Sequence, residues 1–186
     1  MNKSETIDIV MPIEDGRHIP QAVLESIIFQ NLPFRLWITT QFNQRRISDA
    51  RNHVKQYAIS YRVLMLDNDI ILPHNALKKM NQFLDEQPHF AAIALSKNRK
   101  FHVDDPVIVE SHVDMSCVLF RRNILNKLKF RDTRFEENPC CQCIFMCEDI
   151  RALGFEIGFL NHYYARHIQN TNKHLDPANH GECFYD

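Results

Sequence analysis

Short apolar runs alternate with amphipathic segments through the first half of the chain. The apolar runs have the length and composition of buried strands, and the segments between them repeat apolar residues at helical spacing. We expect strands at residues 7–11, 35–40, 62–66 and 91–95, and helices at 20–30, 48–60 and 75–86. This alternating order predicts an α/β fold, in which a mostly parallel, Rossmann-like sheet is flanked by helices on both faces.

Local signals support these helices. Pro20 suits the start of the first helix, and Ser48 suits the cap of the second. The apolar faces should be formed by Val23, Leu24, Ile27 and Ile28, by Ala50, Val54, Tyr57 and Ala58, and by Ala76, Leu77, Met80, Phe83 and Leu84. The single tryptophan, Trp37, falls inside a predicted strand and is expected in the core.

The second half of the chain is less regular. We expect strands at residues 107–111, 116–120 and 155–160, a short helix at 121–130, and a helix at 141–153 that Gly154 ends. We predict one domain over residues 1–186, with a first half at 1–95, a second half at 96–168 and a C-terminal tail at 169–186.

Polar residues follow three of the predicted strands, at residues 11–15, 39–41 and 67–69. Right-handed crossovers place the carboxyl ends of parallel strands on one edge of a sheet, where ligands bind. Asp67 and Asp69, in the run LMLDNDIIL, form a D-x-D at that edge. Such a pair suits Mg²⁺ or Mn²⁺ carrying a diphosphate. A solvated turn and a haloacid-dehalogenase nucleophile are the alternatives, although Ile71 stands where that phosphatase motif needs Thr or Val.

The composition argues against nucleic acid and membranes as binding partners. The 186 residues carry a net charge of −1, so no bulk basic field exists to bind nucleic acid or an anionic membrane. No apolar stretch approaches the roughly 20 residues of a membrane span. Because residue 1 leads almost directly into a strand-like run, we expect no signal peptide and a cytoplasmic protein, in the host cytoplasm if the source is a virus.

Six cysteines are present, and four of them crowd into CCQCIFMC. Their spacing lacks the paired CxxC knuckles of a structural zinc site. The cysteines could therefore bind zinc, form a disulfide or remain free thiols, and the sequence does not choose among these three alternatives. No P-loop and no GxGxxG after the first strand are present, which argues against an NTPase and a dinucleotide oxidoreductase.

Five sequence segments between residues 7 and 168 together form a recognisable pattern. They are DIVMPIEDGRHIPQAVLESIIFQ, SDARN, LMLDNDIILPHNALKKM, SCVLFRRNIL and CEDIRALGFEIGFL followed by ARHI. Their order and spacing resemble family 2 of the GT-A nucleotide-sugar glycosyltransferases, and the small size resembles compact viral or archaeal members. The resemblance implies a GT-A fold and Mn²⁺- or Mg²⁺-dependent transfer of a sugar from a nucleotide diphosphate to a hydroxyl of a glycan, protein or lipid. It also implies that residues 1–95 form the nucleotide-sugar-binding half and residues 96–168 the acceptor-side half.

The resemblance also implies roles for individual residues. Asp67, Asp69 and His167 of ARHI would form the metal site, with Asp69 as a direct ligand and Asp67 in contact with the ribose or a metal-bound water. The remaining nucleotide-sugar contacts would come from Pro12, Ile13, Glu14, Thr40, Arg51 and Asp114. Thr40 lies where the family commonly has an acidic residue that reads uracil, so the nucleobase stays open.

Family 2 inverts the anomeric centre, which requires a carboxylate base. The family's base belongs to an "ED" about a dozen residues before a glycine, and here that position holds Gln142 and Cys143. The visible pair, Glu148 and Asp149, lies closer to Gly154. Asp149 is our first candidate, Glu136 or Glu137 is the second, and loss of the base is the third.

Two other functions remain open from the sequence. A nucleotidyltransferase on a related sheet would need a Gly-rich phosphate loop, which IEDGRH does not resemble well. A non-catalytic sugar-nucleotide or glycan binder would keep the fold and lack the base. A zinc-dependent binding module is a further alternative that rests on the cysteines alone.

Overall fold

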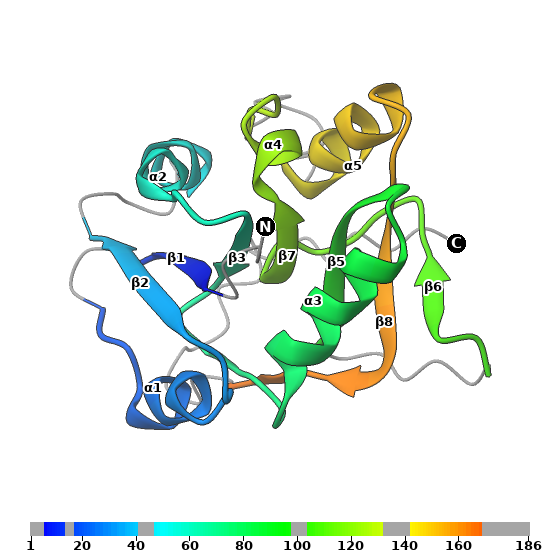
Figure 1. Ribbon diagram of the computed structural model, residues 1–186. Coiled ribbons are helices and arrows are strands. Elements are labelled where there is room, and N and C mark those ends of the chain that lie inside the picture. Colours follow the sequence, from blue (N-terminus) through cyan, green and yellow to red (C-terminus); the bar gives the residue numbers. More distant parts are fainter. Residues whose placement is uncertain (1–5, 14–16, 41–46, 98–103, 132–141, 169–186) are drawn as a thin grey trace, which may run out of the picture.

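The computed structural model describes residues 6–13, 17–40, 47–97, 104–131 and 142–168. Seven of the strands form one sheet that crosses the molecule (Figure 1). In spatial order they are β2 (Phe34–Thr39), β1 (Ile7–Pro12), β3 (Arg62–Leu66), β7 (Cys117–Arg121), β5 (Phe90–Ser96), β8 (Glu156–Tyr164) and β6 (Val107–Val109). All the strands predicted from the sequence are therefore present, with small shifts at their ends.

Strand direction places most carboxyl ends on one edge of the sheet. β1 is parallel to β2 and to β3, and β5 is parallel to β8. β7 lies between β3 and β5 and is antiparallel to both, while β6 is antiparallel to β8. As a result β1, β2, β3, β5 and β8 share one direction, which confirms the mostly parallel sheet. We call the edge at their carboxyl ends the ligand edge.

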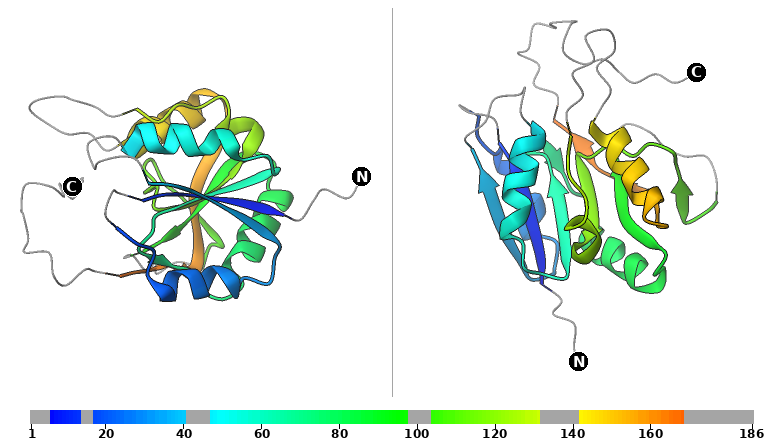
Figure 2. Two further views of the ribbon diagram at one scale, coloured as in Figure 1. Left: turned by 90° about the vertical axis from the view of Figure 1, so that its left-hand side faces the viewer. Right: turned by 90° about the horizontal axis from the view of Figure 1, so that it is seen from above.

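Helices cover both faces of the sheet, as predicted (Figures 1 and 2). One face carries α1 (Gln21–Ile28) and α3 (Ala76–Glu86), and the other carries α2 (Ile47–Val54), α4 (Arg122–Leu125) and α5 (Gln142–Ala152). Each face has its own apolar core, because alternate side chains of a strand point to opposite sides. The two cores share the sheet as a common wall, which holds the strand ends in place.

Helical periodicity predicted the buried residues correctly in α3, the longer of the two helices on this face. All five predicted apolar residues of α3 are buried. In α1 only Val23 and Ile27 are buried, and the prediction for Ile28 is wrong, because α1 ends at this residue and leaves its side chain exposed. Gly154 follows the end of α5 with a φ of 80°, a conformation that favours glycine.

Two predicted helices are shorter in the structure. The second helix ends at Val54 and continues only as the 3-10 turn η2 (Lys55–Tyr57), whose Tyr57 is exposed rather than buried. The helix predicted at 121–130 consists of α4 alone. Within the described residues, no helix has both the length and the apolar composition that a bilayer crossing requires.

A second, two-stranded sheet was not predicted. β4 (Ile70–Ile71) pairs in antiparallel fashion with β9 (Arg166–His167), so that Ile70 lies opposite His167. Strands of two residues carry no periodicity that the sequence could reveal. The pairing matters because β4 begins directly after Asp69.

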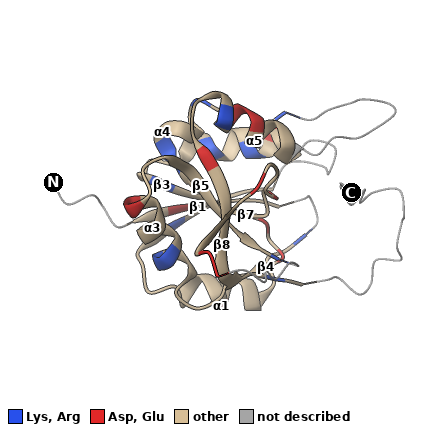
Figure 3. Ribbon diagram, turned by 90° about the vertical axis from the view of Figure 1, so that its right-hand side faces the viewer, with Lys and Arg blue, Asp and Glu red and all other residues tan. Residues whose placement is uncertain are grey.

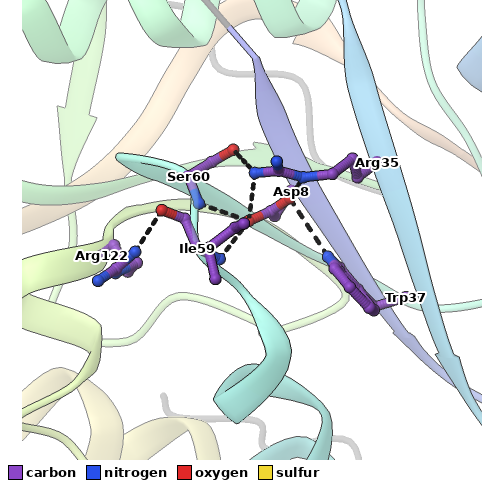
Figure 4. Close-up of polar contacts among 6 residues, drawn as sticks. All are labelled: Asp8, Arg35, Trp37, Ile59, Ser60 and Arg122. Atoms are coloured by element: carbon purple, nitrogen blue, oxygen red, sulfur yellow. Dashed lines mark hydrogen bonds and ion pairs between the residues drawn. The ribbon is translucent and has the colours of Figure 1, made fainter. Parts of the chain in front are cut away.

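A buried carboxylate joins the first three strands of the sheet (Figure 4). Asp8 of β1 is fully buried and accepts hydrogen bonds from both faces of the Arg35 fork, at 2.6 and 3.2 Å, and from Trp37 Nε1 at 3.2 Å. The backbone N–H groups of Ile59 and Ser60, just before β3, donate at 2.6 Å each to Asp8 Oδ2, the oxygen that also accepts from Arg35 Nη2. Trp37 is thus half-buried and polar in its contacts, not a purely apolar core residue.

These hydrogen-bond donors favour the ionised form of Asp8. Burial raises the pKa of the carboxyl, but the hydrogen bonds from Arg35, Ser60, Trp37 and Ile59 outweigh burial and leave the pKa lowered. A carboxylate with a lowered pKa contributes stability above its unfolded-state pKa of about 3.9 and loses it as the pH falls through the folded value.

We predict that Asp8→Ala destabilises the protein by about 3–5 kcal/mol at pH 7, because it leaves Arg35 and two backbone donors without their buried partner. Urea unfolding followed by circular dichroism measures this. Glu86→Ala, at an exposed position of α3, is the control and should change the free energy of unfolding by no more than about 0.5 kcal/mol. Equal effects of the two substitutions would contradict the assignment.

Candidate functional site

Three carboxylates come together at the ligand edge, and we call Asp67, Asp69 and Asp114 the acid cluster. Asp67 and Asp69 follow β3, while Asp114 lies just before β7, the antiparallel neighbour of β3. The two loops are joined directly, because Asp67 N–H donates to Ser116 O at 2.9 Å. Acidic segments in these loops lie beside β7 and β4 (Figure 3). The charges interact, since both Asp69 and Asp114 raise the pKa of Asp67.

Arg51 is the partner of Asp67. Its Nη2 donates to Asp67 Oδ1 at 2.7 Å, and the Arg51 side chain is only 4% exposed. It extends from α2 and lies 5.9 Å from the centre of the Phe130 ring. Burial raises the pKa of Asp67, Arg51 opposes this, and the other two acids add to it, so the pKa is raised overall. The predicted nucleotide contact Arg51 is thus held inside the site by the D-x-D itself.

His167 is the partner of Asp69. Its Nε2 lies 3.0 Å from Asp69 Oδ2, and the β4–β9 pairing together with a 2.8 Å hydrogen bond from Ile168 N–H to Asp69 O holds the two residues in register. Burial raises the pKa of Asp69, but the hydrogen bond and charge of His167 and the charge of Lys97 outweigh it, so the pKa is lowered. The structure thus brings together two of the predicted metal ligands.

Lys97 is the partner of Asp114. Its Nζ lies 2.8 Å from Asp114 Oδ2, and Ser116 N–H donates to Asp114 Oδ1 at 2.7 Å. Burial raises the pKa of Asp114, but Lys97 and Ser116 outweigh it and leave the pKa lowered. Each member of the acid cluster is therefore matched by one basic side chain from another element, namely α2, β9 or the end of β5.

The pair of Asp69 and His167 is suited to one hard divalent cation. Two adjacent ligands at about 2.1 Å from an octahedral ion lie about 3.0 Å apart, and the observed separation of Oδ2 and Nε2 is 3.0 Å. Among the described residues, no three His, Cys, Asp or Glu side chains converge as a complete metal site. A cation here would need ligands from a bound phosphate and water, which is how Mg²⁺-type ions are commonly held.

Other predicted donor contacts lie at the same edge. Pro12 ends β1 and is buried, and Thr40 follows β2 and is exposed. Ile13 N–H donates to Thr39 O at 2.8 Å, so the ends of β1 and β2 stay paired. Glu14 lies outside the described residues.

The structure does not bring Asp149 to the acid cluster. α5 leads through Gly154 into β8, which runs parallel to β5, so α5 begins near the ligand edge and ends near the opposite one. Asp149 lies six residues after Cys143, about 9 Å further along the helix, and its carboxylate pairs with Arg131 at 2.7 Å. Glu148 is exposed, and Glu136 and Glu137 lie outside the described residues.

Three features of the site were not found from the sequence. Lys97 follows a predicted strand at the ligand edge, and a basic residue there was a usable signal. His112 contacts Cys143, with 2.7 Å between Nε2 and Sγ, and nothing in the sequence pattern connects them. Cys143 is disulfide-bonded, whereas Cys117 and Cys147 are free, and burial raises the pKa of both free thiols.

No protein-family model and no curated protein matches the chain. Solved structures do share its fold. The mannosyltransferase PcManGT from Pyrobaculum calidifontis, in complex with GDP-Man and Mn²⁺, superposes with a TM-score of 0.71 at 14% identity over 90% of this chain and 58% of its own. TarS 1–349 from S. aureus, in complex with UDP-GlcNAc, gives 0.65 at 14% identity over 88% of this chain and 59% of its own.

A197 from STIV gives a TM-score of 0.59 at 8% identity, over 87% of this chain and 85% of its own. This chain therefore spans somewhat less than two thirds of the TarS and PcManGT chains and most of A197. At these identities the similarity establishes the fold, and it confirms the GT-A type of fold predicted from the sequence.

We predict that Lys97→Met raises the pKa values of Asp114 and Asp69, because the ammonium group lowers both. A carboxyl ¹³C NMR titration of aspartate-labelled protein measures these values. Lys79→Met, on the exposed surface of α3, is the control and should leave both unchanged. Unchanged titration of Asp114 in the Lys97 variant would show that the ion pair does not form in solution.

Proposed function

We propose that this protein is a metal-dependent glycosyltransferase that moves a sugar from a nucleotide diphosphate to an acceptor hydroxyl, with inversion at the anomeric carbon. One observation carries the proposal. At the ligand edge of a GT-A-type sheet, the second aspartate of the D-x-D lies 3.0 Å from a histidine, the spacing of two ligands of one cation. The mannosyltransferase that shares this fold was solved with GDP-Man and Mn²⁺.

The donor would lie across the ends of β1, β2 and β3. Pro12, Glu14 and Thr40 would contact the nucleoside, Asp67 its ribose, and Arg51 the ribose or diphosphate. Asp114, held by Lys97, would contact the sugar. A strand-end site of this kind is where open α/β sheets bind nucleotides.

Asp69 and His167 would hold Mn²⁺ or Mg²⁺ together with the phosphates. When bound, the cation supplies charge stabilisation for the leaving nucleoside diphosphate. The charge balance of the site supports this assignment. A sugar nucleotide carries two negative charges on its diphosphate, which a divalent cation between Asp69 and a neutral His167 would offset, while Asp67 and Asp114 stay paired with Arg51 and Lys97.

Inverting transfer also needs a base for the acceptor hydroxyl. Asp149, with Glu148 beside it, and Glu137 are the candidate carboxylates, since the family position of the base holds Gln142 and Cys143. For Asp149 to act, α5 would have to move or unwind, because this carboxylate lies two turns into the helix and pairs with Arg131.

The position of Asp149 far along α5 favours one alternative function. Since the first turn of α5 carries Gln142 and Cys143 rather than an acid, a protein that binds sugar nucleotides or glycans without transferring the sugar would fit the described residues equally well. Turnover, rather than binding, separates these two functions.

We predict that GDP-Man or UDP-GlcNAc raises the melting temperature only when Mn²⁺ is present. A ligand at 100 times its Kd adds about 2.7 kcal/mol, which is about 5–10 °C for a domain of this size. Asp69→Asn should abolish the shift. The matched control is Asp85→Asn, at the opposite edge, where Asp85 pairs with Arg62 at 2.7 Å.

Differential scanning fluorimetry reads the binding, and release of GDP or UDP reads the turnover. Release by the wild-type protein and none by Asp69→Asn supports the transferase. A shift without release supports the binder. If neither donor, nor any other in a screen of UDP-, GDP- and dTDP-sugars, shifts the melting temperature in the presence of Mn²⁺, the proposal is wrong.

A further inference from the structure

The first turn of α5 packs against the segment that carries Asp114. Cys143 Sγ lies 2.7 Å from His112 Nε2, and Cys147 Sγ, one turn later, accepts from Val113 N–H at 3.3 Å and lies 3.7 Å from Val113 O. Arg151 donates to Ser111 O at 2.8 Å. α5 thus holds residues 111–113 along its length, and His112 lies at the end of α5 that is nearest to the ligand edge.

His112 is two residues from a member of the acid cluster. The backbone between them is irregular and carries the buried Val113, whereas the side chains of His112 and Asp114 are only partly buried. The charges of His112 and Asp114 interact. The imidazole contacts Cys143, which stands at the sequence position where family 2 is expected to carry its base carboxylate.

The contact with Cys143 selects the tautomer of His112. Cys143 is disulfide-bonded and has no S–H, so its sulfur can only accept. A neutral imidazole that donates from Nε2 to this sulfur keeps its lone pair on Nδ1. Among the described residues no hydrogen bond to Nδ1 is made, so this nitrogen keeps its capacity to take a proton.

The surroundings of His112 keep the ring neutral near pH 7. Burial lowers its pKa, and the nearby carboxylates of Asp114 and Glu110 oppose this without reversing it. The titratable groups of α5 that face this segment are the thiol of Cys147 and the guanidinium of Arg151, both engaged with the backbone of residues 111–113. A neutral imidazole is an effective general base.

We propose that His112 takes the proton of the attacking hydroxyl, in place of a carboxylate at the start of α5. The inference rests on the proposed function. In this step the acceptor oxygen forms a bond to the anomeric carbon, the bond from that carbon to the diphosphate oxygen breaks, and the nucleoside diphosphate leaves with the electron pair. The hydroxyl proton passes to Nδ1 of His112, so atoms and charge balance.

The acids of the site are less suited to this role. Asp67, Asp69 and Asp114 are each engaged by a cation, and Asp149 lies far along α5. Lowered pKa values make Asp69 and Asp114 weaker bases than an ordinary carboxylate. His112 is the described side chain next to the cluster that is both neutral and without a cationic partner.

The test compares His112→Gln and His112→Asn with wild type, with water as acceptor. The probes are GDP-Man and UDP-GlcNAc with Mn²⁺, and the readouts are the donor Kd from thermal shift and the kcat of nucleotide release. We expect kcat to fall about 100-fold or more in both variants, with the donor Kd within about threefold of wild type. His89→Gln, at an exposed histidine that pairs with Glu156 at the opposite edge, is the matched control and should keep wild-type kcat.

Each outcome decides the question. A kcat within about threefold of wild type in His112→Gln, or a loss in Asp149→Asn with retention in His112→Gln, overturns the assignment of the base and leaves the glycosyltransferase intact. A wild-type protein that binds no donor overturns the proposed function itself. Donor binding without any turnover by wild type overturns the base and favours the binder. Circular dichroism of each variant confirms folding.

Discussion

Matching of charge at one edge of the sheet is the constraint on which this structure depends. Three carboxylates meet where β3 ends and β7 begins, and like charges at short range raise the free energy of the folded state unless cations oppose them. Arg51 from α2 and Lys97 after β5 supply that opposition to Asp67 and Asp114, and His167 from β9 forms a hydrogen bond with Asp69. Segments far apart in the sequence are thereby tied to one place. In the proposed function, a divalent cation and a diphosphate would join this site with charges that cancel each other.

The rest of the fold serves to hold these charges in place. β7 lies antiparallel between β3 and β5, so its start brings Asp114 beside the carboxyl end of β3. The small β4–β9 sheet sets His167 against Asp69. At the other end of β1, Asp8 connects β1, β2 and the approach to β3 through Arg35, Trp37 and two backbone donors. A rigid sheet with two apolar cores is what permits the strand ends to present charges at short distances.

Sequence reasoning predicted what periodicity and strand ends encode. Apolar runs and the turn residues between them predicted the strands, the helices and the ligand edge, and they placed the D-x-D at that edge. In α3, all the residues predicted to form the apolar face are buried. Contacts between distant segments were out of reach, because nothing local connects Asp8 with Arg35, Asp114 with Lys97, or His112 with Cys143. The ends of elements were also missed, as with Ile28 and the short α4, since tertiary packing rather than propensity decides where a helix stops. The proposed base depends on such a distant contact, while the D-x-D does not.

Pulsed electron paramagnetic resonance of Mn²⁺ added with GDP-Man tests the central claim most directly, because it detects the nuclei that lie next to the ion. If Asp69 and His167 share the cation with the donor, the spectrum will show ³¹P couplings from the diphosphate and a ¹⁴N coupling from one imidazole, and the ¹⁴N coupling will vanish in His167→Gln. A spectrum with water protons alone, or a nitrogen coupling that survives that substitution, would contradict the account.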